Sequence, residues 1–205
     1  LMQPFPGQPT SHGDPRLTPG HPPAYTATSC LGQGLAAHRD ALLADHSGLA
    51  PCTFETVRLD TWVGEGPGVD AVVLPPSPAA YDCRNNRLAA LGLETDGFGD
   101  RVREAITRHG RDRVGVFMGT STSGILKTEL AYRRRDPVSG ALPPDFDYRH
   151  THNSFSLADY VRAHFGLEGM ALVISTACSS SAKVFAAAAR QLALGRIDAA
   201  GLGGG

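Results

Sequence analysis

The feature that most constrains the fold is the alternation of short apolar runs with amphipathic stretches bounded by glycine or small polar residues. The clearest unit is an apolar run at 171–175, a turn of small residues at 176–178, and helical spacing over 179–194 that ends at Gly195. A second strand-like run follows at 198–202. This order is typical of strands covered by helices, so the sequence predicts an α/β protein rather than a bundle or a sandwich.

The same pattern predicts elements along the rest of the chain. Strands are expected at 24–28 and 114–118, helices at 34–45, 83–93, 98–109 and 125–134, and loops over most of 46–80 and 135–154. A further helix is expected to open at Ser156 and end near Gly166, because Ser156 and Asp159 have the spacing of a capping box. No internal repeat is evident in this arrangement.

Residues 1–23 contain seven prolines and almost no aliphatic side chains. Such a segment buries too little apolar surface to offset the entropy of ordering, so it is expected to be a disordered tail that packs on nothing. Residues 24–205 are expected to form the folded domain. Because the sequence starts at Leu1 and stops at three glycines inside a predicted strand-to-turn transition, both ends are expected to be cuts within a longer chain.

Composition excludes several classes of function. Nineteen basic and 20 acidic residues give a net charge of -1, which provides no general field for nucleic acid or an anionic membrane. No run approaches the roughly 18 apolar residues of a membrane span, and no signal peptide is recognisable, so a cytoplasmic protein is predicted. The four cysteines form no CxxC pair, so neither a metal nor another cofactor is predicted.

Cys178 is the strongest candidate for a reactive residue. It is expected to lie directly after a buried central strand, at the start of a helix, where unpaired N–H groups and the helix dipole favour the thiolate over the thiol. The small residues that follow it leave room for an acyl thioester, and the Cys178 N–H can face a developing oxyanion. A small buried core cysteine is the alternative interpretation of the position alone. The other cysteines, Cys30, Cys52 and Cys83, lack this strand–turn–helix placement and are expected to be non-catalytic.

Three segments resemble one family, the β-ketoacyl-acyl-carrier-protein synthases. They are Ile174-Ser175-Thr176-Ala177-Cys178-Ser179-Ser180-Ser181-Ala182-Lys183, the stretch from Gly195 and Asp198 to Gly203-Gly204-Gly205, and the turn from Gly119 to Gly124. The block 171–205 is the most specific part of the resemblance. It implies a thiolase-type fold, of which this chain is the N-terminal half of an α-β-α-β-α layered architecture.

The resemblance also implies an activity. In this family a cysteine, here Cys178, accepts an acyl group from acyl carrier protein and then condenses it with decarboxylating malonyl-carrier protein. The two catalytic histidines and a lysine of the family lie in the second half, so none of the eight histidines here inherits that role and the 205 residues alone are expected to be inactive in condensation. A homodimer is implied, with Met170 to Ile174 as the strand that pairs across its two-fold axis.

Two further groups are candidate site residues. By resemblance, Ser121 and Thr122 line the acyl pocket, whereas a plain strand-to-helix turn explains the same small residues equally well. The arginines at positions 133–135 and 149 offer a docking patch for an acidic carrier protein, and a solvated helix end is the alternative. The four residues are Arg133, Arg134, Arg135 and Arg149.

Three other classes of protein are weighed against this prediction. A phosphate-binding P-loop is disfavoured, because Ile125 and Leu126 separate the second glycine from Lys127. A serine-hydrolase elbow is disfavoured because Ser123 stands where its second glycine belongs. A non-catalytic partner of a complete synthase, such as a chain-length factor, stays open, although such partners typically lack the cysteine.

Overall fold

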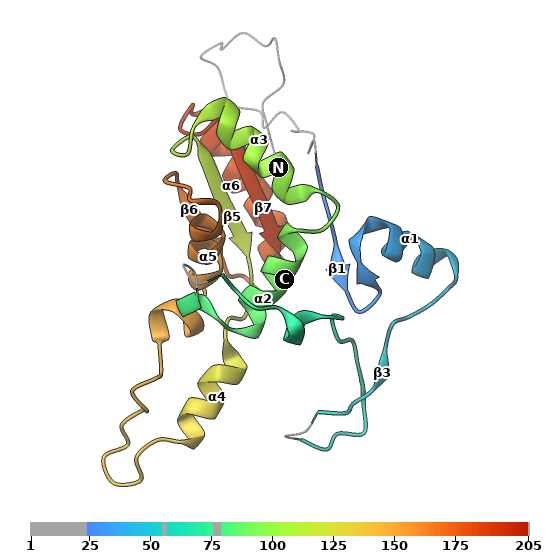
Figure 1. The fold of residues 1–205 in the computed structure, drawn as a ribbon, viewed down its shortest axis with the longest axis vertical. Coiled ribbons are helices and arrows are strands. Elements are labelled where there is room, and N and C mark those ends of the chain that lie inside the picture. Colours follow the sequence, from blue (N-terminus) through green and yellow to red (C-terminus); the bar gives the residue numbers. More distant parts are fainter. Residues whose placement is uncertain (1–23, 55–56, 76–78, 205) are drawn as a thin grey trace.

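The core of the protein is a parallel sheet of three strands, β5 (Val114–Gly119), β6 (Ala171–Ile174) and β7 (Ala199–Gly204). The computed structural model describes residues 24–54, 57–75 and 79–204, so the predicted tail at 1–23 lies outside the described residues. In the sheet β5 is central, with β6 and β7 on either side (Figure 1). Every residue of β5 is buried, as its continuous apolar run predicted.

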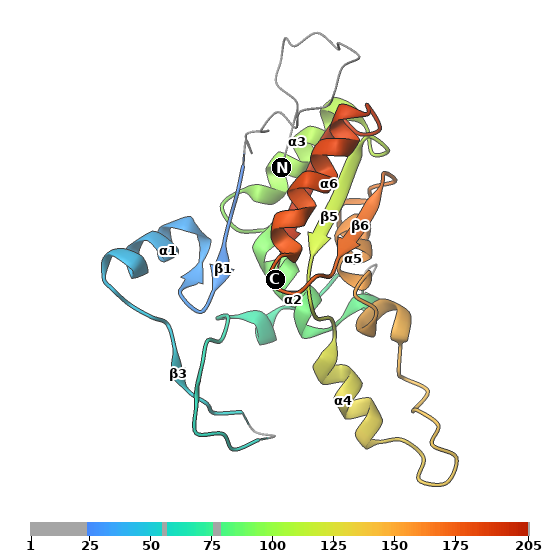
Figure 2. The same ribbon diagram turned by 180° about the vertical axis from the view of Figure 1, so that it is seen from behind.

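Helices cover both faces of this sheet, as expected for an α/β fold. Helices α2 (Arg84–Leu93), α3 (Phe98–His109) and α5 (Ser156–Phe165) lie on one face, and α6 (Ser180–Ala193) lies on the other (Figures 1 and 2). Alternate residues of β5 face the two layers: Val114, Val116 and Met118 join the cluster with α3 and α5, whereas Phe117 joins the cluster with α6.

Arg113 fixes the start of β5 against the start of β7. Its guanidinium donates two hydrogen bonds to the Asp198 carboxylate, at 2.9 and 3.0 Å, and a third at 2.8 Å to the Gly195 carbonyl behind α6. The hydrogen bond from Arg113 lowers the pKa of Asp198. One side chain therefore joins the ends of two strands and a helix.

The described residues before α2, up to Tyr81, form little regular structure. The strand pairs are β1 (Thr28–Ser29) with β2 (Gly32–Gln33) and β3 (Ala50–Pro51) with β4 (Trp62–Val63), and the helices are α1 (Gly34–Leu43) and the short 3₁₀ turns η1 (Val69–Ala71) and η2 (Ala79–Tyr81). The predicted strand at 24–28 is wrong in extent, because only its last residue enters a strand, and that strand forms a short hairpin instead of joining the sheet. Residues 46–75 are largely irregular, as predicted.

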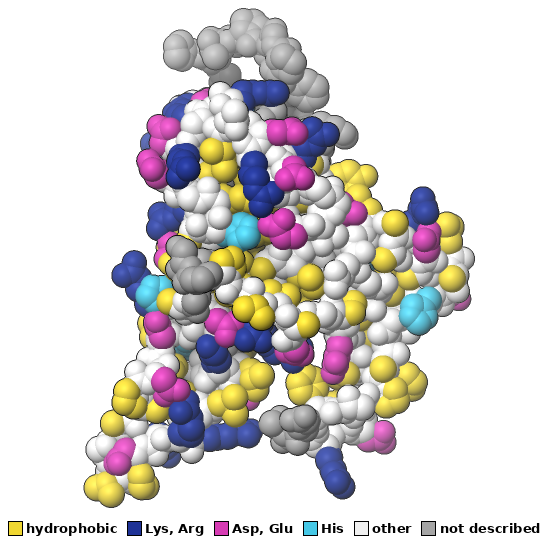
Figure 3. Space-filling view, in the orientation of Figure 1, with side chains coloured by type: hydrophobic (Ala, Val, Ile, Leu, Met, Phe, Trp, Pro, Cys, Tyr) yellow, Lys and Arg dark blue, Asp and Glu magenta, His cyan; other side chains and the backbone are white. Residues whose placement is uncertain are grey.

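Residues 125–152 form an arm that extends away from the sheet (Figure 1). The arm consists of α4 (Ile125–Arg133) and the one-turn π-helix η3 (Tyr148–His152), joined by a loop. Hydrophobic side chains reach the surface on this arm and around β3 and β4 (Figure 3). These include Leu130, Tyr132 and Val138 on the arm and Leu59 and Trp62 near β4. The core sheet itself is well covered on its α2–α3–α5 face.

The predicted capping box at the start of α5 is wrong. Helix α5 does begin at Ser156 and end next to Gly166, its C-cap, but its N-cap is Phe155 and no side chain caps it. The Ser156 hydroxyl instead accepts a hydrogen bond from Asn86 at 2.9 Å, and Asp159 accepts one from the Tyr81 hydroxyl at 2.7 Å. Both residues therefore bond α5 to other elements, α2 and η2, and local spacing cannot predict such contacts.

Candidate functional site

Three segments meet at the carboxyl edge of the sheet. Because the strands are parallel, the residues that follow them emerge at the same edge. Gly119 at the end of β5 pairs with Ile174 of β6 and with Gly204 of β7. The Thr120 N–H then donates to the Ile174 carbonyl at 3.1 Å, which extends the pairing one residue beyond β5. The loop after β5 and the turn after β6 therefore lie side by side.

The turn after β6 is held by its own hydroxyl groups. The Ser180 hydroxyl accepts a hydrogen bond from the Thr176 N–H at 2.9 Å and donates one to the Ala177 carbonyl at 2.7 Å. The Ser179 hydroxyl donates to the Thr176 carbonyl at 3.0 Å. Ala177 has a φ of 52°, in the left-handed region that non-glycine residues rarely adopt. The serines thus hold a sharp turn that the backbone alone would not favour.

Cys178 lies in this turn, directly before Ser179, which is the N-cap of α6, and its side chain is exposed. The prediction of a buried central strand before it is wrong. Strand β6 is at the edge of the sheet and its residues are only partly buried, because no described strand pairs with its outer edge. The fully buried central strand is β5, which leads to the neighbouring loop.

Glycine lets the start of α6 approach the ends of the strands. A Cβ on Gly119 would lie 2.6 Å from the Ser180 carbonyl carbon and 2.7 Å from the Ser181 nitrogen, both backbone atoms that cannot rotate away. A Cβ on Gly204 would overlap the Ser181 hydroxyl. The start of α6, beside Cys178, therefore packs directly against the backbone of β5 and β7.

Ser121 and Thr122 lie in the loop after β5, and both are exposed. The buried Thr120 shapes this loop, because its hydroxyl donates to the Thr122 carbonyl at 2.7 Å. Since β5 and β6 are adjacent, the structure brings this loop next to the Cys178 turn. A role of these two residues in an acyl pocket stays a prediction.

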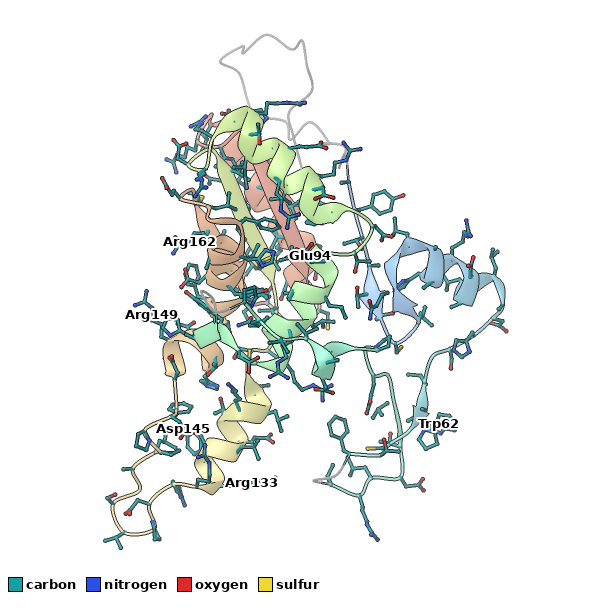
Figure 4. All side chains as sticks on the ribbon, in the orientation of Figure 1. Trp62, Glu94, Arg133, Asp145, Arg149 and Arg162 are labelled. Carbon is teal, nitrogen blue, oxygen red and sulfur yellow. The ribbon has the colours of Figure 1, made fainter. Side chains whose placement is uncertain are left out.

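The predicted arginine patch is divided in space. Arg133 lies at the end of α4, whereas Arg149 lies in η3, and the two are well separated along the arm (Figure 4). Arg134 pairs with Asp145 at 2.8 Å, and this hydrogen bond holds the pKa of Asp145 below its usual value. Arg133 and Arg135 are exposed beside it. A docking role for these residues stays a prediction.

A polar network between α2 and α5 was missed by sequence reasoning. Asn86 is fully buried and bonds to the Tyr81 carbonyl at 2.8 Å as well as to Ser156. Burial, together with the hydrogen bond to Asp159, raises the pKa of Tyr81 to about 12. The network joins α2 to α5, and the signal for it was a pair of asparagines at a helix start.

Other kinds of site find little support in the described residues. Within 24–54, 57–75 and 79–204, no helix is long and apolar enough to cross a membrane. In the same ranges no group of three or more histidine, cysteine or acidic side chains could hold a metal ion.

The parallel sheet, the helices on both its faces and the cysteine turn at its carboxyl edge define half of a thiolase-type α/β fold, the fold of the condensing enzymes. The model of the β-ketoacyl synthase N-terminal domain matches residues 93–205, which is more than half of the chain. The protein therefore belongs to the β-ketoacyl synthase family.

Comparison with solved structures agrees with this assignment. The chain is similar to one in the structure of the ketosynthase ApeO in complex with its chain length factor ApeC from Xenorhabdus doucetiae, with a TM-score of 0.66 and 25% identity. The match covers 88% of this chain and 46% of the solved one, so this chain spans about half of its length. No curated protein matches.

Proposed function

We propose that the chain is the N-terminal part of a β-ketoacyl-acyl-carrier-protein synthase in which Cys178 accepts the acyl group. The observation that supports this most is the position of Cys178, exposed in a turn directly before the N-cap of a 14-residue helix. Few other positions in a protein combine access for a thioester with unpaired N–H groups and the positive end of a helix dipole.

The acylation step uses groups of this chain. The Cys178 thiolate attacks the carbonyl carbon of an acyl thioester on a carrier protein, a new C–S bond forms, and the C–S bond to the carrier breaks. The carrier leaves as a thiolate that takes up a proton. Backbone N–H groups at the start of α6, including that of Cys178, stabilise the oxyanion of the intermediate.

The condensation step needs groups beyond those of this chain. Malonyl-carrier protein loses carbon dioxide, and the resulting carbanion attacks the acyl group on Cys178 and releases the thiolate. Family resemblance assigns the stabilisation of this decarboxylation to two histidines in the second half of the fold. The 205 residues are therefore proposed to supply the acyl acceptor and not the decarboxylation machinery.

The substrate and partner surfaces follow from the same placement. Ser121 and Thr122, next to the cysteine turn, are proposed to line the acyl pocket. Arg133, Arg135 and Arg149 are proposed to meet the acidic carrier protein, with Arg134 contributing less because Asp145 already pairs with it.

A homodimer through β6 is also proposed. Strand β6 pairs only with β5 among the described strands, so its other edge has free backbone groups, and Leu172 is 38% exposed along it. A second copy paired there would continue the sheet. The alternative, a non-catalytic partner subunit, is favoured by the presence of a chain length factor in the solved relative's complex and disfavoured by Cys178.

The test is acyl transfer to the purified chain from acyl carrier protein loaded with a labelled acyl group, followed by intact mass measurement. A mass increase of one acyl group is expected, lost in Cys178→Ala and kept in Cys52→Ala, which removes a partly buried cysteine elsewhere. Equal labelling of the two variants would exclude Cys178 as the acceptor. A β-ketoacyl product from this chain alone, with malonyl-carrier protein added, would contradict the proposed need for the second half.

A further inference from the structure

The loop at residues 120–124, which leads from the carboxyl end of β5 into α4, is held at both of its ends (Figure 1). Its first residue is bonded to β6 at the carboxyl edge of the sheet. At its other end the Ser123 hydroxyl donates to the His152 carbonyl, and the Gly124 N–H donates to the Thr151 carbonyl at 2.7 Å. The end of the loop is therefore bonded to η3, which belongs to a later part of the chain.

Thr128, in the first turn of α4, joins these two segments. The residue is buried, with 8% of its surface exposed. Its hydroxyl donates to the Gly124 carbonyl at 3.1 Å and lies 2.7 Å from His152 Nδ1. A threonine in a helix commonly bonds to the carbonyl four residues before it, but the helix does not require the second contact, which is made to a different element. One hydroxyl group therefore contacts both the last residue of the loop and the last residue of η3.

The junction between the loop and η3 is closely packed around Gly124. A Cβ at this position would lie 2.5 Å from the Thr151 carbonyl oxygen and 3.1 Å from Cys83 Cβ. Thr151 and Cys83 are both buried, and Cys83 is the N-cap of α2. Because closely packed groups move together, a displacement of η3 would displace the end of the loop with it.

The π-helix η3 is itself fastened to the body of the protein. Asp147, its N-cap, accepts a hydrogen bond from the His150 N–H at 3.0 Å, and the other carboxylate oxygen of Asp147 lies 2.6 Å from His150 Nδ1. The His150 ring packs edge-on against the Tyr81 ring, with the ring centroids 4.8 Å apart. Tyr81 in turn is bonded to Asp159 of α5. Through these contacts η3 can act as a fixed support for the loop.

Between its two held ends the loop exposes Ser121 and Thr122 next to the Cys178 turn. We propose that Thr128 is a positioning residue for acyl transfer, which through η3 holds Ser121 and Thr122 where the acyl chain of the thioester is received. This role rests on the proposed function, in which these two residues line the acyl pocket. The Cys178 turn is held separately, by the hydroxyl groups of its own serines. Loss of the Thr128 hydroxyl should therefore change the discrimination between acyl chains and not the reactivity of the thiol.

The experiment measures, by intact mass, the rate of transfer to Cys178 from carrier protein loaded with an acetyl or an octanoyl group. Thr128→Val keeps the shape of the side chain without its hydroxyl, so octanoyl transfer should slow about tenfold and acetyl transfer less than about twofold. Alkylation of Cys178 by iodoacetamide, which needs no acyl pocket, should keep its rate. Thr128→Ser restores the hydroxyl and should restore octanoyl transfer.

Thr95→Val is the matched control. The Thr95 hydroxyl also bonds to the carbonyl four residues before it, that of Leu91 at 2.7 Å, but it lies just beyond the C-cap of α2, away from η3. This variant should change neither transfer rate. Ser123→Ala is a second variant at the junction, because it removes the hydroxyl bonded to the His152 carbonyl, and it should lower the octanoyl-to-acetyl ratio in the same direction.

The outcomes separate this role from the proposed function. A wild-type protein that gains no acyl group on Cys178 would contradict the proposed function and the role of Thr128 with it. Acylation of the wild type with an unchanged octanoyl-to-acetyl ratio in Thr128→Val and Ser123→Ala would overturn the positioning role alone. Equal slowing of both transfers together with slower alkylation of Cys178 would also overturn it, because these variants would then have lost structure in general.

Discussion

The region at residues 93–204 and the region at residues 24–75 differ in how much apolar surface they bury. The first region holds the parallel sheet, whose central strand is buried on both faces by apolar side chains. The second region has two-residue strands and exposes Leu42 and Trp62 by 70% and 65%. It contributes Leu74 to the core of the first region, and polar contacts also fasten it there. One such contact is Asp96, which accepts hydrogen bonds from the Leu35 N–H at 2.9 Å and from the Thr26 hydroxyl at 2.8 Å.

This difference has a consequence for stability. The region with its own core should unfold as one cooperative unit, whereas the polar-fastened region should open locally at lower free energy. The family model also separates the two regions, because it matches residues 93–205 and none of residues 24–75, whereas the structural match extends over 88% of the chain. The four predictions below test the contrast from the largest expected effect to the smallest.

The largest effect is expected from Phe117→Ala. Phe117 is completely buried between β5 and α6, so its removal loses transfer free energy and leaves a cavity, which should lower the free energy of unfolding by about 3–5 kcal/mol. Trp62→Ala removes a larger side chain from the exposed region and should cost less than about 0.5 kcal/mol. Urea unfolding followed by circular dichroism measures both. Equal losses would show that the two regions share one core.

The same contrast explains what the sequence could predict. The runs 114–118 and 171–175 and the helices at 98–109 and 179–194 were predicted within one or two residues, because each has a strong apolar pattern and three of the four are followed by a glycine. The turn with Cys178 followed from the strand and helix on either side of it. The edge position of β6 came only from the family resemblance, because the number of neighbours of a strand depends on the order of strands in space and not on its own residues.

The errors lie where polar groups decide the structure. The predicted strand at 24–28 gave way to a hairpin, and the capping box at Ser156 gave way to a contact with Asn86, 70 residues away. Both features depend on contacts that the spacing of neighbouring residues does not encode.

The second largest effect is expected where the start of α6 packs against β5. Gly119→Ala places a Cβ 2.6 Å from the Ser180 carbonyl carbon, so the helix start must shift, and an overpacking cost of about 1–3 kcal/mol is expected together with slower acylation of Cys178. Gly92→Ala, in α2, meets nothing within 4 Å and should be neutral or stabilising. Thermal unfolding and the acyl-transfer assay measure the two quantities. Unchanged acylation in Gly119→Ala would show that the helix seat does not position Cys178.

The third effect should be confined to the polar-fastened region. Asp96→Gly removes the carboxylate that caps the start of α1 and keeps a residue that tolerates the φ of 54° at this position. A local loss of about 1 kcal/mol is expected, seen as faster amide hydrogen exchange in α1 with no change in β5. Asp96→Asn retains an acceptor oxygen and serves as the control. Faster exchange in both regions would contradict the proposed independence of the two.

The smallest effect lies at the junction of the two regions, where Asp82 precedes α2. Arg87 donates two hydrogen bonds to its carboxylate, at 2.5 and 2.8 Å, and these lower the pKa of Asp82 below its ordinary value of 3.8. A carboxyl group whose pKa is lower in the folded state than in the unfolded state stabilises the fold above the unfolded pKa. That stabilisation is lost as the pH falls from about 4 through the lower folded value.

Asp82→Asn should therefore cost less than about 1 kcal/mol at pH 7 and flatten the loss of stability below pH 4. Arg87→Ala should flatten the same part of the profile, and the double variant should flatten it no further, because both substitutions break one interaction. Urea midpoints between pH 7 and pH 3 provide the measurement, and additive effects of the two substitutions would show that Asp82 owes its pKa to another neighbour, such as Lys127 at 3.8 Å.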